Sequence, residues 1–146
     1  MRLYTIGFTQ KTAERFIGML REHGVGRLLD IRLHPDGQLS GFAKRADLPY
    51  FLDRLVGCDY RHLPELAPTA EIFSGYRADK DWDRYVRRFE ALMDERAVPA
   101  SLDRRTFEER AACLLCSEHQ PTQCHRRLVA ERLARVWPEV EIVHLV

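Results

Sequence analysis

Apolar residues recur along this chain with two different spacings, and each spacing predicts its own kind of element. Short unbroken apolar runs favour strands that are buried on both faces, whereas repeats of three to four residues favour amphipathic helices. Short runs predict strands at residues 2–6, 27–32, 112–117 and 140–146, and a further short strand is expected at 59–62. Helical spacing predicts helices over residues 12–23, 47–56, 81–95, 102–110 and 121–136.

The order of these segments predicts the fold. Strands that alternate with helices are typical of a parallel sheet with helices on both faces. We therefore expect one α/β domain over residues 1–146, with three layers and a mostly parallel, Rossmann-like central sheet of about five strands. Two connections, 33–46 and 63–79, are expected to be irregular, and so long a stretch as the second is usually functional or disordered.

Length and composition agree with one globular domain and exclude other classes of protein. The 146 residues are 45% hydrophobic and 31% charged, which argues against disorder and against collagen-like repeats. The longest apolar run, 111–116, is far shorter than the roughly 20 residues of a membrane span. Because the first residues also lack the apolar core of a signal peptide, we expect a cytoplasmic protein without a membrane partner.

Charge is nearly balanced, with 23 Lys and Arg against 22 Asp and Glu. A net charge of +1 gives no overall attraction to DNA or to an anionic membrane, so any site for an anion must be local. The basic residues are 20 Arg and only 3 Lys, and the planar guanidinium suits phosphate and carboxylate groups. A GC-rich genome also accounts for abundant arginine, so the excess alone identifies no ligand.

Polar and reactive side chains gather where the predicted strands end. Ligands of open parallel α/β sheets bind beyond the carboxyl ends of the strands, so these residues form the candidate site. The candidate catalytic residues are Asp30, Cys116, Glu118, Cys124 and His125. The candidate ligand-binding residues are Gly7, Thr9, Arg32, Lys44, His62 and Arg126.

Asp30 and Arg32 are two apart on a predicted central strand, so they share one face. A buried charge without a partner is costly, and each of these two residues therefore needs one. Two interpretations stay open. The pair forms a structural salt bridge at the end of the strand, or Arg32 binds an anionic ligand while Asp30 orients it or handles a proton.

The four cysteines are Cys58, Cys113, Cys116 and Cys124, and no disulfide framework is expected without a secretory signal. A zinc site is not expected, because Cys113 and Cys116 lie in one strand and point to opposite faces. Cys124 is expected in the first turn of a helix, where the dipole would favour an anion and lower the pKa of the thiol. Cys116 and Cys124 also fit the alternative of small buried hydrophobic side chains. His125 is expected to meet Glu118 or Asp30 as a general base.

Seven short motifs carry a resemblance to a known family. They are Thr5-Ile6-Gly7-Phe8-Thr9, Asp30-Ile31-Arg32-Leu33-His34-Pro35, Phe42-Ala43-Lys44, Tyr60-Arg61-His62-Leu63-Pro64-Glu65-Leu66, Cys116-Ser117-Glu118, Cys124-His125-Arg126 and Val143-His144-Leu145. Together they resemble the bacterial and archaeal family known as domain of unknown function 488, over nearly the whole chain. The resemblance implies an α/β fold and a site at the Cys-x-Glu and Cys-His-Arg motifs, with no established reaction. Phe8 stands where many members carry His or Tyr, and Ala67 where many carry Gly.

Two functions follow from these residues. The first is an enzyme without a cofactor that acts on a phosphate-bearing substrate, a nucleotide or a nucleic acid, in a pocket at the carboxyl ends of the strands. The alternative is a non-catalytic module that binds a small anionic ligand or a nucleic-acid strand there, with aromatic side chains of the 63–79 segment stacking a base or simply covering the core. A third interpretation is a zinc site formed by Cys113, Cys116, Cys124 and His125.

Overall fold

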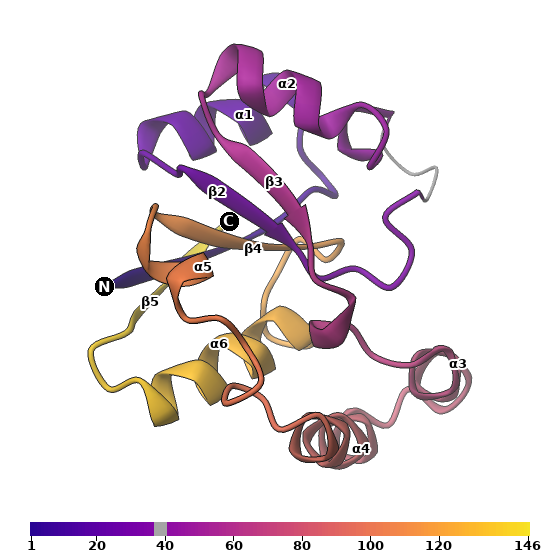
Figure 1. Ribbon diagram of the computed structural model, residues 1–146. Helices are drawn as coiled ribbons and strands as arrows, with labels where there is room; N and C mark the ends of the chain where they lie inside the picture. Colours follow the sequence, from indigo (N-terminus) through magenta and orange to yellow (C-terminus); the bar gives the residue numbers. More distant parts are fainter. Residues whose placement is uncertain (37–40) are drawn as a thin grey trace.

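Figure 1 shows a computed structural model of the chain, which describes residues 1–36 and 41–146. Its strands are β1 (Arg2–Gly7), β2 (Arg27–Asp30), β3 (Asp59–His62), β4 (Ala112–Cys116) and β5 (Glu141–Leu145). They form one sheet in the order β3-β2-β4-β1-β5, and every neighbouring pair is parallel. The prediction of a three-layer α/β fold around a parallel five-stranded sheet is confirmed.

Helices cover both faces of the sheet (Figure 1). They are α1 (Ala13–Glu22), α2 (Leu48–Leu55), α3 (Ala70–Asp79), α4 (Trp82–Glu95), α5 (Arg105–Glu108) and α6 (His125–Val136), with 3₁₀ turns η1 (Gly41–Ala43) and η2 (Pro64–Leu66). The helices α1 and α2 lie on one face, whereas α4, α5 and α6 lie on the other. Within residues 1–36 and 41–146, no helix is both long and apolar enough to cross a membrane.

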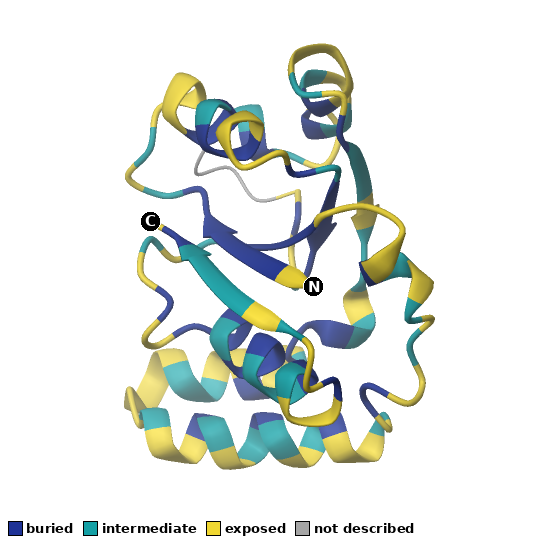
Figure 2. Ribbon diagram, turned by 90° about the vertical axis from the view of Figure 1, so that its left-hand side faces the viewer, coloured by how far each residue is buried: buried dark blue, intermediate teal, exposed yellow. Residues whose placement is uncertain are grey.

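The central strands supply two separate cores, because successive side chains of a strand point to opposite faces. In β4, Leu114 belongs to the core beneath α4 and α6, and Leu115 belongs to the core beneath α1 and α2. All residues of β2 and β4 are buried, which explains why their sequences are apolar runs rather than alternating patterns. Figure 2 shows the same contrast at the other side of the sheet, where β1 is dark blue and the edge strand β5 is largely teal.

The strand order places a crevice at the end of β4. The neighbouring strands β1 and β2 lead into helices on one face, whereas β4 leads into α6 on the opposite face. Connections that leave in opposite directions open a space between them, and ligands of such sheets bind at this point. The residues that follow β2 and β4 therefore border one hollow.

The segment 63–79, predicted to be irregular, contains η2 and the ten-residue helix α3. Thr69 begins α3, and its Oγ1 accepts a hydrogen bond from the Ile72 amide at 3.2 Å. Ile72 is the only buried residue of this helix, and Gly75 lies in its interior. The apolar stripe that normally indicates a helix is therefore weak here.

Other boundaries also differ from the prediction. The last helix begins at His125 rather than Pro121, because Cys124 has an extended backbone, with φ −141° and ψ 139°. β2 ends at Asp30, two residues early, and α5 covers only four residues of the predicted 102–110 helix. In the predicted loop 33–46, positions 37–40 lie outside the described residues, and 41–43 form η1.

Replacement of Phe89 by alanine should destabilise the domain strongly. Phe89 is fully buried between α4 and the sheet, and its ring stacks on Tyr85 with centroids 5.9 Å apart. Loss of such a ring typically lowers the free energy of unfolding by about 3–5 kcal/mol. Urea unfolding measures the change, with Tyr50→Ala on the exposed side of α2 as the control, expected within about 0.5 kcal/mol. Equal losses in the two variants would contradict the packing described here.

Candidate functional site

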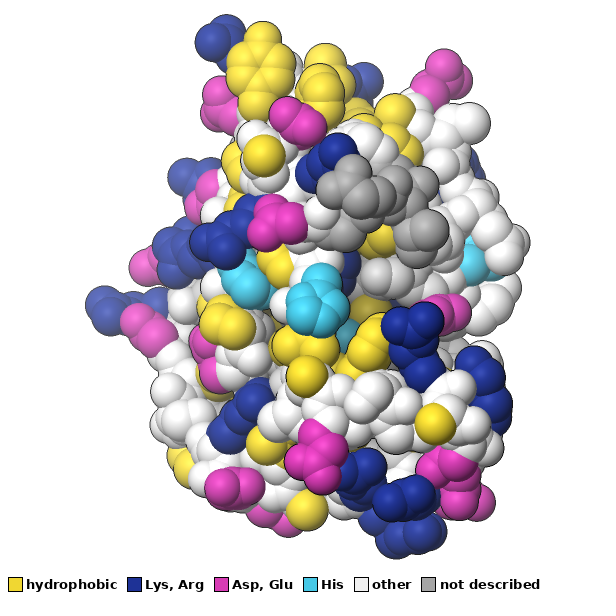
Figure 3. All heavy atoms as spheres, turned by 90° about the vertical axis from the view of Figure 1, so that its right-hand side faces the viewer, with side chains coloured by type: hydrophobic (Ala, Val, Ile, Leu, Met, Phe, Trp, Pro, Cys, Tyr) yellow, Lys and Arg dark blue, Asp and Glu magenta, His cyan; other side chains and the backbone are white. Residues whose placement is uncertain are grey.

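A cavity of about 350 Å³ opens at the carboxyl ends of β2 and β4. Its lining comes from the segments that follow these strands, from the start of α6, and from α3 and α4. Figure 3 shows this side of the molecule, where histidine and arginine side chains border hydrophobic ones. Small-molecule sites usually measure roughly 300–1,000 Å³, so the cavity has the size of such a site.

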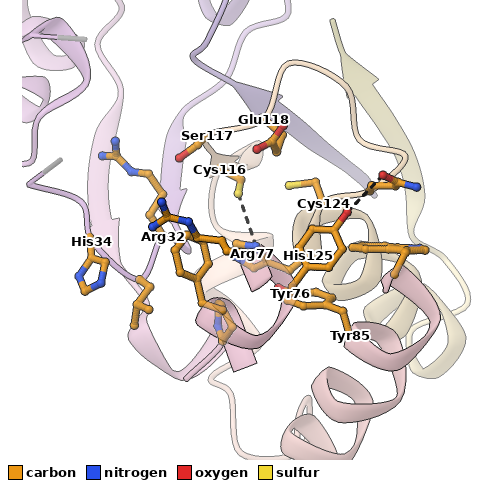
Figure 4. A pocket seen from close by; sticks show the side chains of 15 residues that line it. Arg32, His34, Tyr76, Arg77, Tyr85, Cys116, Ser117, Glu118, Cys124 and His125 are labelled. Carbon is orange, nitrogen blue, oxygen red and sulfur yellow. Dashed lines mark hydrogen bonds between the residues drawn. The ribbon is translucent and has the colours of Figure 1, made fainter. Parts of the chain in front are cut away.

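Cys116 and His125 lie side by side in the lining of the cavity (Figure 4), and His125 also contacts the backbone of Ile31. The Cys116 Sγ lies 3.5 Å from His125 Nδ1, and His125 Nε2 lies 2.7 Å from the Ile31 carbonyl oxygen. A carbonyl only accepts, so Nε2 donates its hydrogen there and Nδ1 faces the sulfur. The partner of His125 is therefore Cys116, rather than the predicted Glu118 or Asp30.

The register of the sheet fixes these three groups. Cys116 is the last residue of β4 and lies on the same face as Leu114, toward α4 and α6. Ile31 continues the pairing of β2 with β4, because its amide donates to the Leu115 carbonyl at 3.1 Å. His125 is the first residue of α6, and its ring packs against Phe89 with centroids 5.7 Å apart.

The two thiols at this site differ in their ionisation. A hydrogen bond from Cys124 lowers the pKa of the Cys116 thiol, and backbone hydrogen bonds from Ser117 and Glu118 and the charge of Arg126 act in the same direction. These contacts outweigh the burial that opposes ionisation. For Cys124, burial raises the pKa well above the ordinary value, and the neighbouring Cys116 raises it further. Cys116 is therefore the more readily ionised thiol of the pair, and Cys124 donates a hydrogen bond to it.

The same side chains have the donor atoms of a metal site. The ligating atoms of Cys116, Cys124 and His125 all lie within 4.8 Å of one another, close enough to share one ion. Cys113 is not part of this group, because it belongs to the core beneath α1 and α2, on the other face of the sheet. A zinc site with four ligands that include Cys113 is therefore wrong. As the strand pattern predicted, Cys113 and Cys116 point to opposite faces of the sheet.

Asp30 and Arg32 form a buried ion pair. The guanidinium of Arg32 donates to both carboxylate oxygens of Asp30, with Nε–Oδ1 at 2.9 Å and Nη2–Oδ2 at 2.7 Å. The Tyr60 hydroxyl donates to the same carboxylate at 2.5 Å, and Arg32 also donates to the Ala43 carbonyl. Arg32 lines the cavity, whereas Asp30 is fully buried. Of the two interpretations of this pair, these contacts agree with the structural salt bridge. Arg32 also borders the cavity.

Arg126, Gly7 and Thr9 hold the loop after β4 rather than line the cavity. Arg126 is fully buried and donates to Thr5 Oγ1 and to the carbonyls of Glu118 and His119. Gly7 packs so closely on this loop that a Cβ there would lie 1.6 Å from the Glu118 carbonyl oxygen. Thr9 donates its hydroxyl to the Ser117 carbonyl at 2.7 Å. These predicted ligand-binding residues therefore support the loop that carries the site.

Of the remaining predicted site residues, one lines the cavity and two do not. Glu118 lines the cavity and is exposed there. His62 does not line the cavity. Its Nε2 donates to the Arg32 carbonyl at 3.0 Å. Lys44 is half-buried next to Ala43, whose carbonyl binds Arg32, and is not part of the cavity lining. The structure thus gathers Arg32, Cys116, Glu118, Cys124 and His125 around one cavity.

Comparison with known proteins identifies the family of the chain. Residues 12–133 match the model of a family described as "Domain of unknown function DUF488". The chain belongs to this family. No curated protein and no solved structure matches it significantly. The match confirms the resemblance expected from the sequence motifs, and both cysteine motifs of the cavity lie within the DUF488 domain.

Some lining residues of the DUF488 domain were not among the predicted site residues. An aromatic wall faces the cysteines from α3 and α4, and it consists of Phe73, Tyr76, Trp82 and Tyr85. Arg77 and Gln123 also line the cavity. The sequence shows this cluster of aromatic residues. The side of the cavity on which they lie depends on α3, which the sequence pattern does not predict.

The pH dependence of alkylation should distinguish Cys116 from the other thiols. Alkylation follows the thiolate fraction, so a lowered pKa means that Cys116 reacts with iodoacetamide at a lower pH than an ordinary thiol. Burial raises the pKa of Cys58 to about 12, so this thiol should stay unmodified throughout the neutral range. Peptide mass spectrometry after timed alkylation measures each site. Cys124→Ala, which removes the hydrogen bond to Cys116, should move the reaction of Cys116 to higher pH, and Cys113→Ser should leave it unchanged.

Replacement of Asp30 by asparagine should cost more stability than removal of the whole ion pair. Asp30→Asn leaves the Arg32 guanidinium, only 5% exposed, without its counter-charge. Such a loss typically lowers the free energy of unfolding by about 3–5 kcal/mol. The double variant Asp30→Leu, Arg32→Met removes both charges and should lose less in the same urea unfolding experiment. A double variant as unstable as Asp30→Asn would show that the pair contributes more than mutual neutralisation.

Proposed function

We propose that this DUF488 protein is a cysteine-dependent enzyme that acts on a phosphate-bearing substrate of the nucleotide type. One observation carries the proposal: the Cys116 Sγ lies 3.5 Å from His125 Nδ1, while His125 Nε2 is held by the Ile31 carbonyl. A thiol beside an imidazole that a third group orients is the arrangement that activates cysteine nucleophiles. The position of the pair at the base of a cavity gives a substrate access to the sulfur.

The proposed reaction is a hydrolysis in two steps. The Cys116 thiolate donates an electron pair to an electrophilic atom of the substrate, the bond to the leaving group breaks, and the leaving group takes a proton from His125. Water then attacks the thiol-bound intermediate and gives one proton to His125, which restores the thiolate and the protonated imidazole. The Ile31 carbonyl keeps the ring in place in both steps, because Nε2 donates to it whether Nδ1 is protonated or not.

The aromatic wall supports a flat ring as one part of the substrate. Trp82 and Tyr85 are stacked with an interplanar angle of 15° and centroids 5.1 Å apart, and Tyr76 packs against both. A nucleobase that stacks on such a surface gains about 1–3 kcal/mol. Gln123 lies beside this wall, where its Oε1 accepts a hydrogen bond from the Tyr76 hydroxyl at 3.2 Å. Its amide group is thereby held at the edge where a base would sit.

Basic side chains at the rim support a phosphate as the second part. Arg77 is exposed at the cavity, with its guanidinium carbon 5.7 Å from the centre of the Phe73 ring. His34 is also exposed and lines the same cavity. The guanidinium fork suits phosphate oxygens, and Arg126 is occupied by the loop carbonyls. We therefore expect the phosphate near Arg77 and His34 and the ring along the aromatic wall.

Turnover and binding by single variants test this proposal. The protein is incubated with nucleoside mono-, di- and triphosphates and with short single-stranded oligonucleotides, and products are identified by liquid chromatography with mass spectrometry. At least one compound should give a product and also protect Cys116 from alkylation. Cys116→Ser should abolish turnover and retain binding, whereas Cys113→Ser, on the other face of the sheet, should retain both.

Two further variants test the substrate class. Trp82→Ala and Arg77→Ala should weaken binding, the first by about 5- to 150-fold as one stacked base predicts. Tyr50→Ala, an exposed aromatic residue of α2 outside the cavity, is the matched control and should bind normally. Ligands that bind and protect Cys116 without any product would establish the non-catalytic module instead. If no compound of the panel binds, the proposed substrate class is wrong.

A further inference from the structure

Cys124 does not attack the substrate in the proposed reaction, although it lies next to the reactive sulfur and donates a hydrogen bond to it. Its side chain is buried, only 3% of the residue is exposed, and its Sγ lies within 4.8 Å of the Cys116 Sγ. Both cysteines line the cavity, and Figure 4 shows the two sulfur atoms facing the same space. A second thiol at this distance from a thiolate has a chemical consequence of its own, because the two can form a disulfide.

We propose that Cys124 is the resolving thiol for Cys116, and that a hydroperoxide switches the site off by driving a reversible disulfide between them. The proposal rests on the nucleophilic Cys116 of the proposed function and adds regulation to that site. The hydroperoxide is the only co-reactant for oxidation, and a dithiol reductant restores the two thiols.

The chemistry proceeds in two balanced steps. The Cys116 thiolate attacks one oxygen of the hydroperoxide, the oxygen–oxygen bond breaks, and the leaving alkoxide or hydroxide takes a proton from His125. The sulfur is thereby oxidised to a sulfenic acid, and the peroxide is reduced to an alcohol or water. Cys124 sulfur then attacks the sulfenic sulfur, its proton joins the departing hydroxyl, and one water leaves as the disulfide forms.

Rotation of the Cys124 side chain is the movement by which this bond forms. The sulfurs must approach to about 2.05 Å, so at least one cysteine has to move. Cys116 ends β4 and Cys124 precedes α6, and residues 117–123 between them contain neither helix nor strand. The Cys124 side chain makes no capping hydrogen bond to α6, so its rotation does not break the helix start.

The other two cysteines lack these conditions. Cys58 and Cys113 belong to the core beneath α1 and α2, on the opposite face of the sheet from Cys116. Burial raises the pKa of both thiols, that of Cys58 to about 12, so neither is ionised near neutral pH. Oxidation is therefore expected at the Cys116–Cys124 pair alone, and Cys113→Ser provides a matched control within the same segment.

Mass spectrometry of the oxidised full chain tests the proposal. The protein, treated first with EDTA and with its zinc content measured, is exposed to a few equivalents of hydrogen peroxide at neutral pH and then blocked with iodoacetamide. Cleavage after Arg110, Glu118 and Arg126 separates Cys124 from Cys113 and Cys116. We expect the two peptides to remain joined through Cys116 and Cys124, two hydrogens lighter than the reduced pair, and to separate after dithiothreitol. Cys113→Ser should give the same disulfide.

The variant Cys124→Ser decides whether Cys124 resolves the oxidised sulfur. It should form no disulfide, and Cys116 should instead advance to sulfinic and sulfonic acid, which dithiothreitol does not reverse. Identical oxidation of Cys116 in the wild type and in Cys124→Ser would overturn the proposal, as would a disulfide through Cys113. One zinc per chain that persists after EDTA and leaves both thiols unreactive would also overturn it. The readout needs no substrate, so a disulfide that forms in a protein without nucleotide turnover would refute the proposed function alone.

Discussion

The buried guanidinium of Arg126 is the contact on which the geometry of the site depends. A fully buried cation must have its hydrogen bonds satisfied inside the protein, and Arg126 finds its acceptors in Thr5 of β1 and in the carbonyls of Glu118 and His119. The loop after β4 is thereby folded back over the start of α6. This fold brings Cys116, at one end of the loop, to the same place as Cys124 and His125 at the other end.

The sheet order gives this arrangement a cavity to face. Because β4 lies between β1 and β2 but leads to the opposite face, the chain after Cys116 turns away from the helices that follow its neighbours. The space left between them is closed on its far side by the aromatic residues of α3 and α4. Strand order therefore determines where the sulfur of Cys116 is exposed to the cavity. The helices α3 and α4 supply the side chains that a ligand in this cavity would contact.

The sequence predicted the fold because most of its strands are unambiguous. Runs such as Ala112–Cys116, buried at every position, have one structural interpretation in an alternating α/β chain. The rule that ligands bind beyond strand ends then selected five residues that do line the cavity, among them Arg32 and Glu118. What could not be predicted depends on helix starts: α6 begins four residues later than expected, and each residue turns a helical side chain by about 100°. The pairing of His125 with Cys116, and the burial of Arg126, therefore needed the structure.

The charge of Arg126 also explains why a cation is buried beside two thiols. It lowers the pKa of Cys116, and its Nη1 lies 3.7 Å from the Cys124 Sγ, so it stabilises negative charge on the cysteine pair. A neutral residue that filled the same volume would leave the loop carbonyls without donors and the thiolate without this field. Loop shape and thiolate stability thus depend on one side chain, the Arg of the Cys-His-Arg motif.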